Sequence, residues 1–124
     1  MIYTSYFGKV KELDLGLYTP IAICGKAVDG WQFPQYKRLA PSWSIYSEYK
    51  LHGGTEERYI ERYKAEILGK LSIDKVVDDL YSMTADGTDP VLICYEKPGD
   101  FCHRHLVAEW LGKDLCAGEL LKPL

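Results

Sequence analysis

The apolar positions of the chain fall into two kinds of segment. Three short runs are apolar at most positions and rich in β-branched or aromatic residues: Ile2–Phe7, Tyr18–Cys24 (with Ile21–Cys24 its apolar part) and Val91–Tyr95. Runs of this length and composition are typical of strands that are buried on both faces. The sequence therefore predicts three short strands of a covered sheet.

In longer segments the apolar residues recur every three or four positions, which predicts amphipathic helices. Each helix follows a residue whose side chain can accept a hydrogen bond from the first turn. The predicted helices are Trp43–Lys50 after Ser42, Glu56–Gly69 after Thr55, Ile73–Met83 after Ser72 and Phe101–Gly112 after Asp100. Buried strands separated by helices favour a mainly parallel sheet. We therefore predict an α/β fold, with residues 1–124 as a single compact domain of the Rossmann-like three-layer kind.

The remaining segments carry weaker signals. Residues 25–41 contain glycine, proline and three aromatics, which predicts a long ordered loop. Residues 7–18 and 115–124 show no firm pattern, and either stretch could contain a further strand.

Composition and charge narrow the function classes. The 124 residues carry a net charge of −3 at pH 7, which argues against non-specific nucleic-acid binding by the whole surface and leaves room for a local basic groove. No apolar run approaches the roughly 20 residues of a membrane span, and the N-terminus does not resemble a signal segment. We expect a cytoplasmic protein with no membrane partner. Its four cysteines, Cys24, Cys94, Cys102 and Cys116, are then expected to be thiols.

Candidate chemistry gathers between residues 91 and 104, which read VLICYEKPGDFCHR. This segment is predicted to form a strand, a turn at Pro98-Gly99 and the start of a helix. In open α/β sheets, ligands bind outside the carboxyl ends of the strands and near helix N-termini. We therefore expect a site here that contains Glu96, Cys102, His103 and Arg104.

The helical period assigns each of these residues a position. His103 shares one face with Leu106, Val107, Trp110 and Leu111, so it is expected to point toward the sheet. Cys102 in the first turn is expected to have a lowered thiol pKa. Arg104 is expected at the rim of the helix end, where it can hold an anion. Glu96 could orient His103 or act as a base.

Structural roles compete with these functional ones. Cys94 can be a small core residue, His103 can bind a backbone carbonyl, and Arg104 can pair with Glu96 or Asp100.

A zinc site is a further alternative, because Cys94, Cys102, His103 and His105 are suitable ligand types. Helical geometry turns the adjacent residues 102 and 103 apart and places His105 about 200° from His103. No metal is therefore expected.

The strand end Leu92-Ile93-Cys94-Tyr95-Glu96 and the helix start Cys102-His103-Arg104 resemble the bacterial and phage domain-of-unknown-function family 488. The first strand with Thr4 and the continuation Leu106-Val107-Ala108 fit more loosely. Family members commonly carry a glycine-histidine pair after the first strand, where this chain reads Tyr6-Phe7-Gly8-Lys9. The resemblance implies a compact α/β domain of Rossmann-like or related kind and no particular reaction.

A second cluster mixes the aromatics Trp31, Phe33, Tyr36 and Trp43 with the cations Lys37 and Arg38. Such a mixture can stack a base and hold a phosphate, or it can cover the core with its cations in solvent.

These observations lead to one main hypothesis and two alternatives. The first is an enzyme or ligand-binding domain for a phosphorylated or nucleotide-like molecule, with Cys102, His103 and Glu96 as catalytic residues. Arg104, Cys94, Lys37 and Arg38 would contact the ligand, and no cofactor is named by the sequence. The alternatives are a non-catalytic nucleic-acid or protein interaction module that uses residues 31–43, and a thiol sensor or sulfur-transfer protein.

Overall fold

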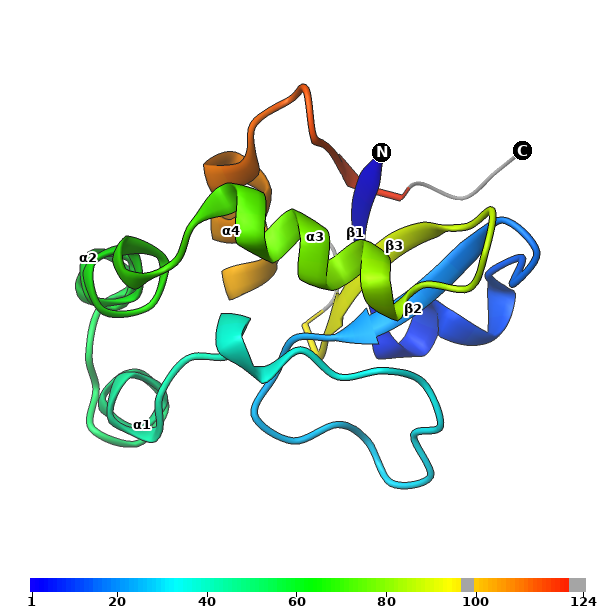
Figure 1. The fold of residues 1–124 in the computed structure, drawn as a ribbon. Helices are drawn as coiled ribbons and strands as arrows, with labels where there is room; N and C mark the ends of the chain where they lie inside the picture. Colours follow the sequence, from blue (N-terminus) through cyan, green and yellow to red (C-terminus); the bar gives the residue numbers. More distant parts are fainter. Residues whose placement is uncertain (97–99, 121–124) are drawn as a thin grey trace.

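A computed structural model describes residues 1–96 and 100–120, and its sheet has the predicted parallel character (Figure 1). The strands are β1 (Ile2–Tyr6), β2 (Tyr18–Ala22), β3 (Asp89–Cys94) and β4 (Cys116–Glu119). Their order is β2-β3-β1-β4, and every neighbouring pair is parallel. The α/β fold class is therefore confirmed. The tail supplies the additional strand β4, which pairs with β1.

The three central helices begin where the sequence predicts. They are α1 (Trp43–Leu51), α2 (Glu56–Glu66) and α3 (Ile73–Met83). The hydroxyls of Ser42, Thr55 and Ser72 accept hydrogen bonds from backbone N–H groups of the first turns, as the cap prediction requires. The predicted end of α2 at Gly69 is wrong, because a short 3₁₀ turn follows over Leu68–Lys70.

The last helix begins later than predicted. Helix α4 spans His103–Leu111, and its N-cap is Cys102 instead of Asp100. The backbone of Cys102 is extended, with φ −152° and ψ 146°, and its carbonyl oxygen accepts a hydrogen bond from the N–H of His105 at 3.1 Å. Cys102 therefore lies outside the helical period. The turn predicted at Pro98-Gly99 lies outside the described residues.

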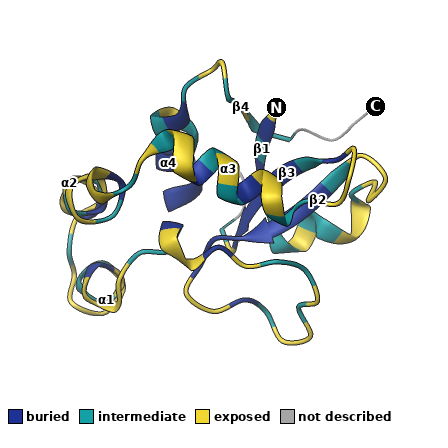
Figure 2. Ribbon diagram, in the orientation of Figure 1, coloured by how far each residue is buried: buried dark blue, intermediate teal, exposed yellow. Residues whose placement is uncertain are grey.

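Two apolar clusters lie on opposite faces of the sheet. Ile21 and Ile23 belong to the cluster that includes buried residues of α2, α3 and α4. The alternate positions Ala22 and Cys24 belong to the cluster that includes Phe7, which lies in the 3₁₀ turn Phe7–Glu12. Figure 2 shows the central strands in dark blue between partly exposed helices. Within the described ranges, no helix has the length and low polarity needed to cross a membrane.

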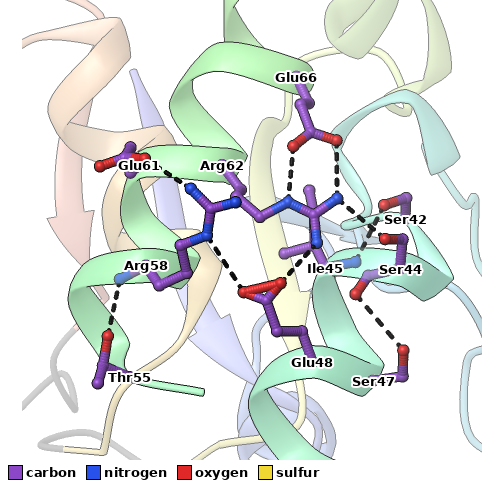
Figure 3. A network of polar contacts seen from close by, with 10 residues as sticks. All are labelled: Ser42, Ser44, Ile45, Ser47, Glu48, Thr55, Arg58, Glu61, Arg62 and Glu66. Carbon is purple, nitrogen blue, oxygen red and sulfur yellow. Dashed lines mark hydrogen bonds and ion pairs between the residues drawn. The ribbon is translucent and has the colours of Figure 1, made fainter. Parts of the chain in front are cut away.

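A polar network fastens α1 to α2 (Figure 3). The guanidinium of Arg62 binds both carboxylate oxygens of Glu66 at 2.7 and 3.1 Å, and it also reaches Glu48 and Ser44 on α1. Its hydrogen bonds lower the pKa of Glu66. Figure 1 shows this helix pair beyond the carboxyl end of β2. The network thus holds a two-helix wall beside the strand ends.

Replacing Arg62 by methionine is expected to lower the urea midpoint of unfolding more than replacing Arg58 by methionine. Both arginines reach Glu48 of α1, but Arg62 is mostly covered, whereas Arg58 is largely exposed and its shortest contact is to Glu61 in its own helix. Exposed ion pairs contribute little to the free energy of unfolding. Equal midpoints for the two variants would show that the covered Arg62 stabilises the helix pair no more than the exposed Arg58.

Candidate functional site

A pocket of about 620 Å³ opens at the carboxyl end of β2 and β3. Its floor contains Cys24, Cys94, Cys102 and His103, and the helices α1 and α2 provide much of its wall. This is where ligands bind in open α/β sheets. The structure therefore brings the predicted Cys94, Glu96, Cys102 and His103 together around one cavity.

The pocket floor contains a disulfide between Cys94 and Cys102. The bond joins the end of β3 to the N-cap of α4. The expectation of four thiols is therefore wrong for this pair, because the end of β3 and the N-cap of α4 lie side by side and bring the two sulfurs together. Cys24 and Cys116 are free and buried, and burial raises the pKa of both thiols.

His103 is held by a backbone carbonyl. Its Nε2 lies 2.8 Å from the carbonyl oxygen of Ile23, which can only accept a hydrogen bond, so Nε2 carries the proton. Its Nδ1 lies 3.8 Å from the Sγ of Cys102. Burial lowers the pKa of His103 to about 4, and the charge of Arg104 adds to this effect. At neutral pH the lone pair of Nδ1 therefore faces Cys102.

The predicted role of Glu96 in orienting His103 is not seen, because the carbonyl of Ile23 holds the imidazole. The carboxylate of Glu96 lies 3.8 Å from the Nζ of Lys50, and both residues line the pocket. Glu96 thus pairs with a cation of α1 and remains beside the cavity.

Arg104 lies inside the protein and not at the rim. Its side chain is 0% exposed, and its Nε and Nη2 donate to Oε1 of Glu119 at 2.9 and 2.7 Å. Its Nη1 donates to the carbonyl of Glu96 at 2.6 Å and contacts the Sγ of Cys94 at 3.4 Å. The rim prediction is wrong because β4, for which the sequence of the tail has no firm pattern, places Glu119 against the guanidinium. Arg104 therefore lies behind the pocket lining, where it joins α4 to β4 and to the end of β3.

The predicted cations Lys37 and Arg38 do not line the pocket. They are exposed on the 3₁₀ turn Lys37–Leu39. Lys26 and Lys50 lie at the pocket instead. Each of these lysines stands alone in the sequence, with no motif around it. Only the tertiary structure brings the two to one pocket.

The aromatics of the predicted loop mostly pack inward. Trp31 meets Phe7 edge-on with ring centroids 5.1 Å apart, and its Nε1 donates to the carbonyl of Pro34. Tyr36 is buried, and its hydroxyl donates to Asp79 at 2.6 Å. The packing therefore shows these aromatics covering the core, which is one of the two roles considered for them.

Aromatic side chains form the pocket wall, and sequence reasoning missed most of them. Trp43 is 70% exposed and Tyr46 is 42% exposed, with ring centroids 5.7 Å apart. The other aromatic lining residues are Tyr49, Tyr59, Tyr95 and Phe101. The sequence of α1 contains a signal for these wall residues. Trp43, Tyr46 and Tyr49, together with Ile45, are spread around more of the helix than one buried face can cover, so some of them must be exposed. Ile45 is the one buried residue of that helix.

Three residues at the floor could hold a metal ion. The ligand atoms of Cys94, Cys102 and His103 lie within 4.8 Å of one another, and all three residues are buried. The predicted divergence of residues 102 and 103 is wrong, because Cys102 is an extended N-cap and not a helical residue, and both side chains line the pocket. His105 lies elsewhere, with its Nε2 3.7 Å from Glu119.

Comparison with known proteins places these residues in a family. The family model DUF488-N3a, described as the active DUF488-N3 subclade, matches residues 19–115. The match includes Cys94, Cys102, His103 and Arg104 but not Glu119. No curated protein and no solved structure matches the chain. Because the family model covers most of the chain, this protein belongs to the DUF488 family, in its N3 subclade.

Proposed function

We propose that this protein is an enzyme that binds a nucleotide-like aromatic anion in the strand-end pocket and acts on it through the reduced Cys102. The observation that carries the proposal is the Nδ1 of His103, which faces the Sγ of Cys102 at the pocket floor. A nucleophilic cysteine beside a base that a third group orients is a recurring catalytic arrangement. Here the orienting group is the carbonyl of Ile23. The subclade that this chain matches is described as active, which agrees with an enzymatic role.

The pocket wall supports the ligand class. Exposed Trp43 and Tyr46 provide ring faces on which a planar base can stack. Lys26 and Lys50 provide positive charge, while Glu96 is the acidic residue of the lining. An incoming phosphate would replace Glu96 as the partner of Lys50. The volume of about 620 Å³ falls within the range of small-molecule sites.

The chemistry begins with reduction of the Cys94–Cys102 disulfide by a cellular dithiol, which is itself oxidised to a disulfide. As the sulfur of Cys102 bonds to an electrophilic atom of the ligand, its thiol proton passes to Nδ1 of His103, because the low pKa of the buried imidazole disfavours proton transfer before the attack. The bond to the leaving group breaks, and that group takes the proton from His103. Water releases the remaining part of the ligand and restores the thiol. A cytoplasmic setting, as the sequence predicts, supplies the reductant.

The alternative of a nucleic-acid or protein interaction module would use the exposed Lys37 and Arg38. The inward packing of Trp31 and Tyr36 leaves that surface with few ring faces to offer. The two possibilities differ in which lysine matters for binding, and this difference can be measured.

We expect nucleoside monophosphates to raise the melting temperature of the reduced protein, because a ligand at 100 times its Kd adds about 2.7 kcal/mol of stability. Lys50→Gln is expected to reduce this shift strongly. Lys37→Gln is the matched control and is expected to keep it. Differential scanning fluorimetry with nucleotides, nucleosides and inorganic phosphate measures all three proteins.

The comparison also separates the two functions. A shift that Lys37→Gln abolishes and Lys50→Gln preserves would favour the interaction surface over the pocket. No shift with any nucleotide in the wild type would remove the ligand class from the proposal.

A further inference from the structure

Two side chains of the pocket floor have the separation of metal ligands, and a third lies beside them. The Sγ of Cys102 lies 3.8 Å from Nδ1 of His103, and the Sγ of Cys94 belongs to the same cluster within 4.8 Å. In a tetrahedral zinc site, with Zn–S near 2.3 Å and Zn–N near 2.1 Å, sulfur and nitrogen ligands lie about 3.6 Å apart. The cysteine-histidine pair therefore already has the spacing of two ligands of one ion.

The outer contacts of these residues also suit a metal. Metal-binding histidines commonly donate their second ring N–H to a backbone carbonyl, which fixes the ring and leaves the other nitrogen free to bind. His103 makes this contact to Ile23 at 2.8 Å. The Nη1 of Arg104 donates to the Sγ of Cys94 at 3.4 Å, and a cationic donor stabilises a thiolate.

The disulfide and a metal ion exclude each other, because both use the same sulfurs. Reduction by a dithiol, which supplies two electrons and two protons and is itself oxidised to a disulfide, converts the pair to two thiols. Metal binding then releases the two thiol protons, since the thiolate is the ligand. The Cα atoms of Cys94 and Cys102 are 7.5 Å apart, wider than most disulfides, so the reduced sulfurs have room to separate around an ion.

We propose that the reduced protein binds one Zn²⁺ through the Sγ atoms of Cys94 and Cys102 and the Nδ1 of His103. All three residues line the pocket, so the fourth coordination position faces the cavity. Three protein ligands with an open position are typical of catalytic zinc sites, and thiolate with imidazole is a set that zinc prefers. This inference does not depend on the proposed function. The metal-bound site and the free cysteine-histidine pair are alternative states of the same floor.

Cobalt is the optical probe for this site. The protein is reduced with a phosphine, freed of metal by chelation and titrated with Co²⁺ without oxygen. We expect a thiolate-to-cobalt charge-transfer band and tetrahedral visible bands that saturate at one ion per chain, and Zn²⁺ should displace them. The disulfide form should show no band. Cys94→Ser and His103→Gln are expected to weaken binding about a hundredfold or more, since even outer contacts are worth 10- to 100-fold.

Cys24→Ser is the matched control, because Cys24 lines the same pocket but lies outside the three-ligand cluster. It should leave the titration unchanged. In wild-type protein, Zn²⁺ should slow the alkylation of Cys94 and Cys102 relative to the same reduced protein without metal, a measurement that needs no variant to fold. Absence of the charge-transfer band, or an unchanged cobalt affinity in Cys94→Ser, would overturn the metal site. Neither result changes the nucleotide-induced shift, which tests the proposed function separately.

Discussion

Replacing Cys102 by serine is expected to lower turnover of a nucleotide-class substrate by roughly 10⁴-fold or more, because loss of a nucleophile removes the reaction path and leaves only binding. Ligand binding, measured by the nucleotide-induced rise in melting temperature, should change little because serine is nearly isosteric. His103→Gln should lower turnover similarly. Its amide can still donate to the carbonyl of Ile23, but no basic nitrogen faces position 102.

Two other cysteine variants serve as controls for this result. Cys24→Ser, in the same pocket, should keep full turnover. Cys94→Ser cannot form the disulfide, so its turnover should no longer depend on added reductant. It should also lose the proposed zinc site, which separates catalysis from metal binding. Unchanged turnover in Cys102→Ser would refute the nucleophile assignment.

Replacing Arg104 by methionine is expected to destabilise the fold by about 3–5 kcal/mol, the usual effect of leaving one member of a buried ion pair without its partner. The guanidinium is fully buried and joins α4 to Glu119 of β4 and to the carbonyl of Glu96. Urea unfolding followed by circular dichroism measures the change. A reduced ligand affinity in this variant would therefore reflect lost structure and not a lost anion contact.

A second substitution tests the cause. Arg104→Met combined with Glu119→Leu should recover much of the stability, because an apolar pair can replace a buried ion pair at little cost. Lys64→Met removes an exposed pair between α2 and α4 (Lys64 with Glu109 at 3.1 Å) and should cost under about 1 kcal/mol. A loss in Arg104→Met no larger than in Lys64→Met would contradict the bracing role.

The elements that could be predicted are those encoded by local signals. The caps Ser42, Thr55 and Ser72 are recognisable because a hydroxyl beside a periodic segment satisfies the free N–H groups of the first turn. The strand at Val91 is recognisable from its continuous apolar run. The predicted cap of α4 at Asp100 is wrong, because Asp is a strong local cap signal and a cysteine is not. A helical Cys102 would point away from His103, whereas the extended Cys102 of the structure lies beside it.

The sequence by itself determined the α/β class, the parallel sheet and the place of the candidate site at the junction between β3 and α4. Periodicity and capping are short-range properties, so they can be recognised in one chain. Only the tertiary structure decided what surrounds Cys102. The carbonyl of Ile23, Glu119 of β4 and the ring of Trp43 lie far from residue 102 in sequence. Parallel pairing and the packing of α1 beside the strand ends bring them to the site, and such long-range contacts leave no local pattern.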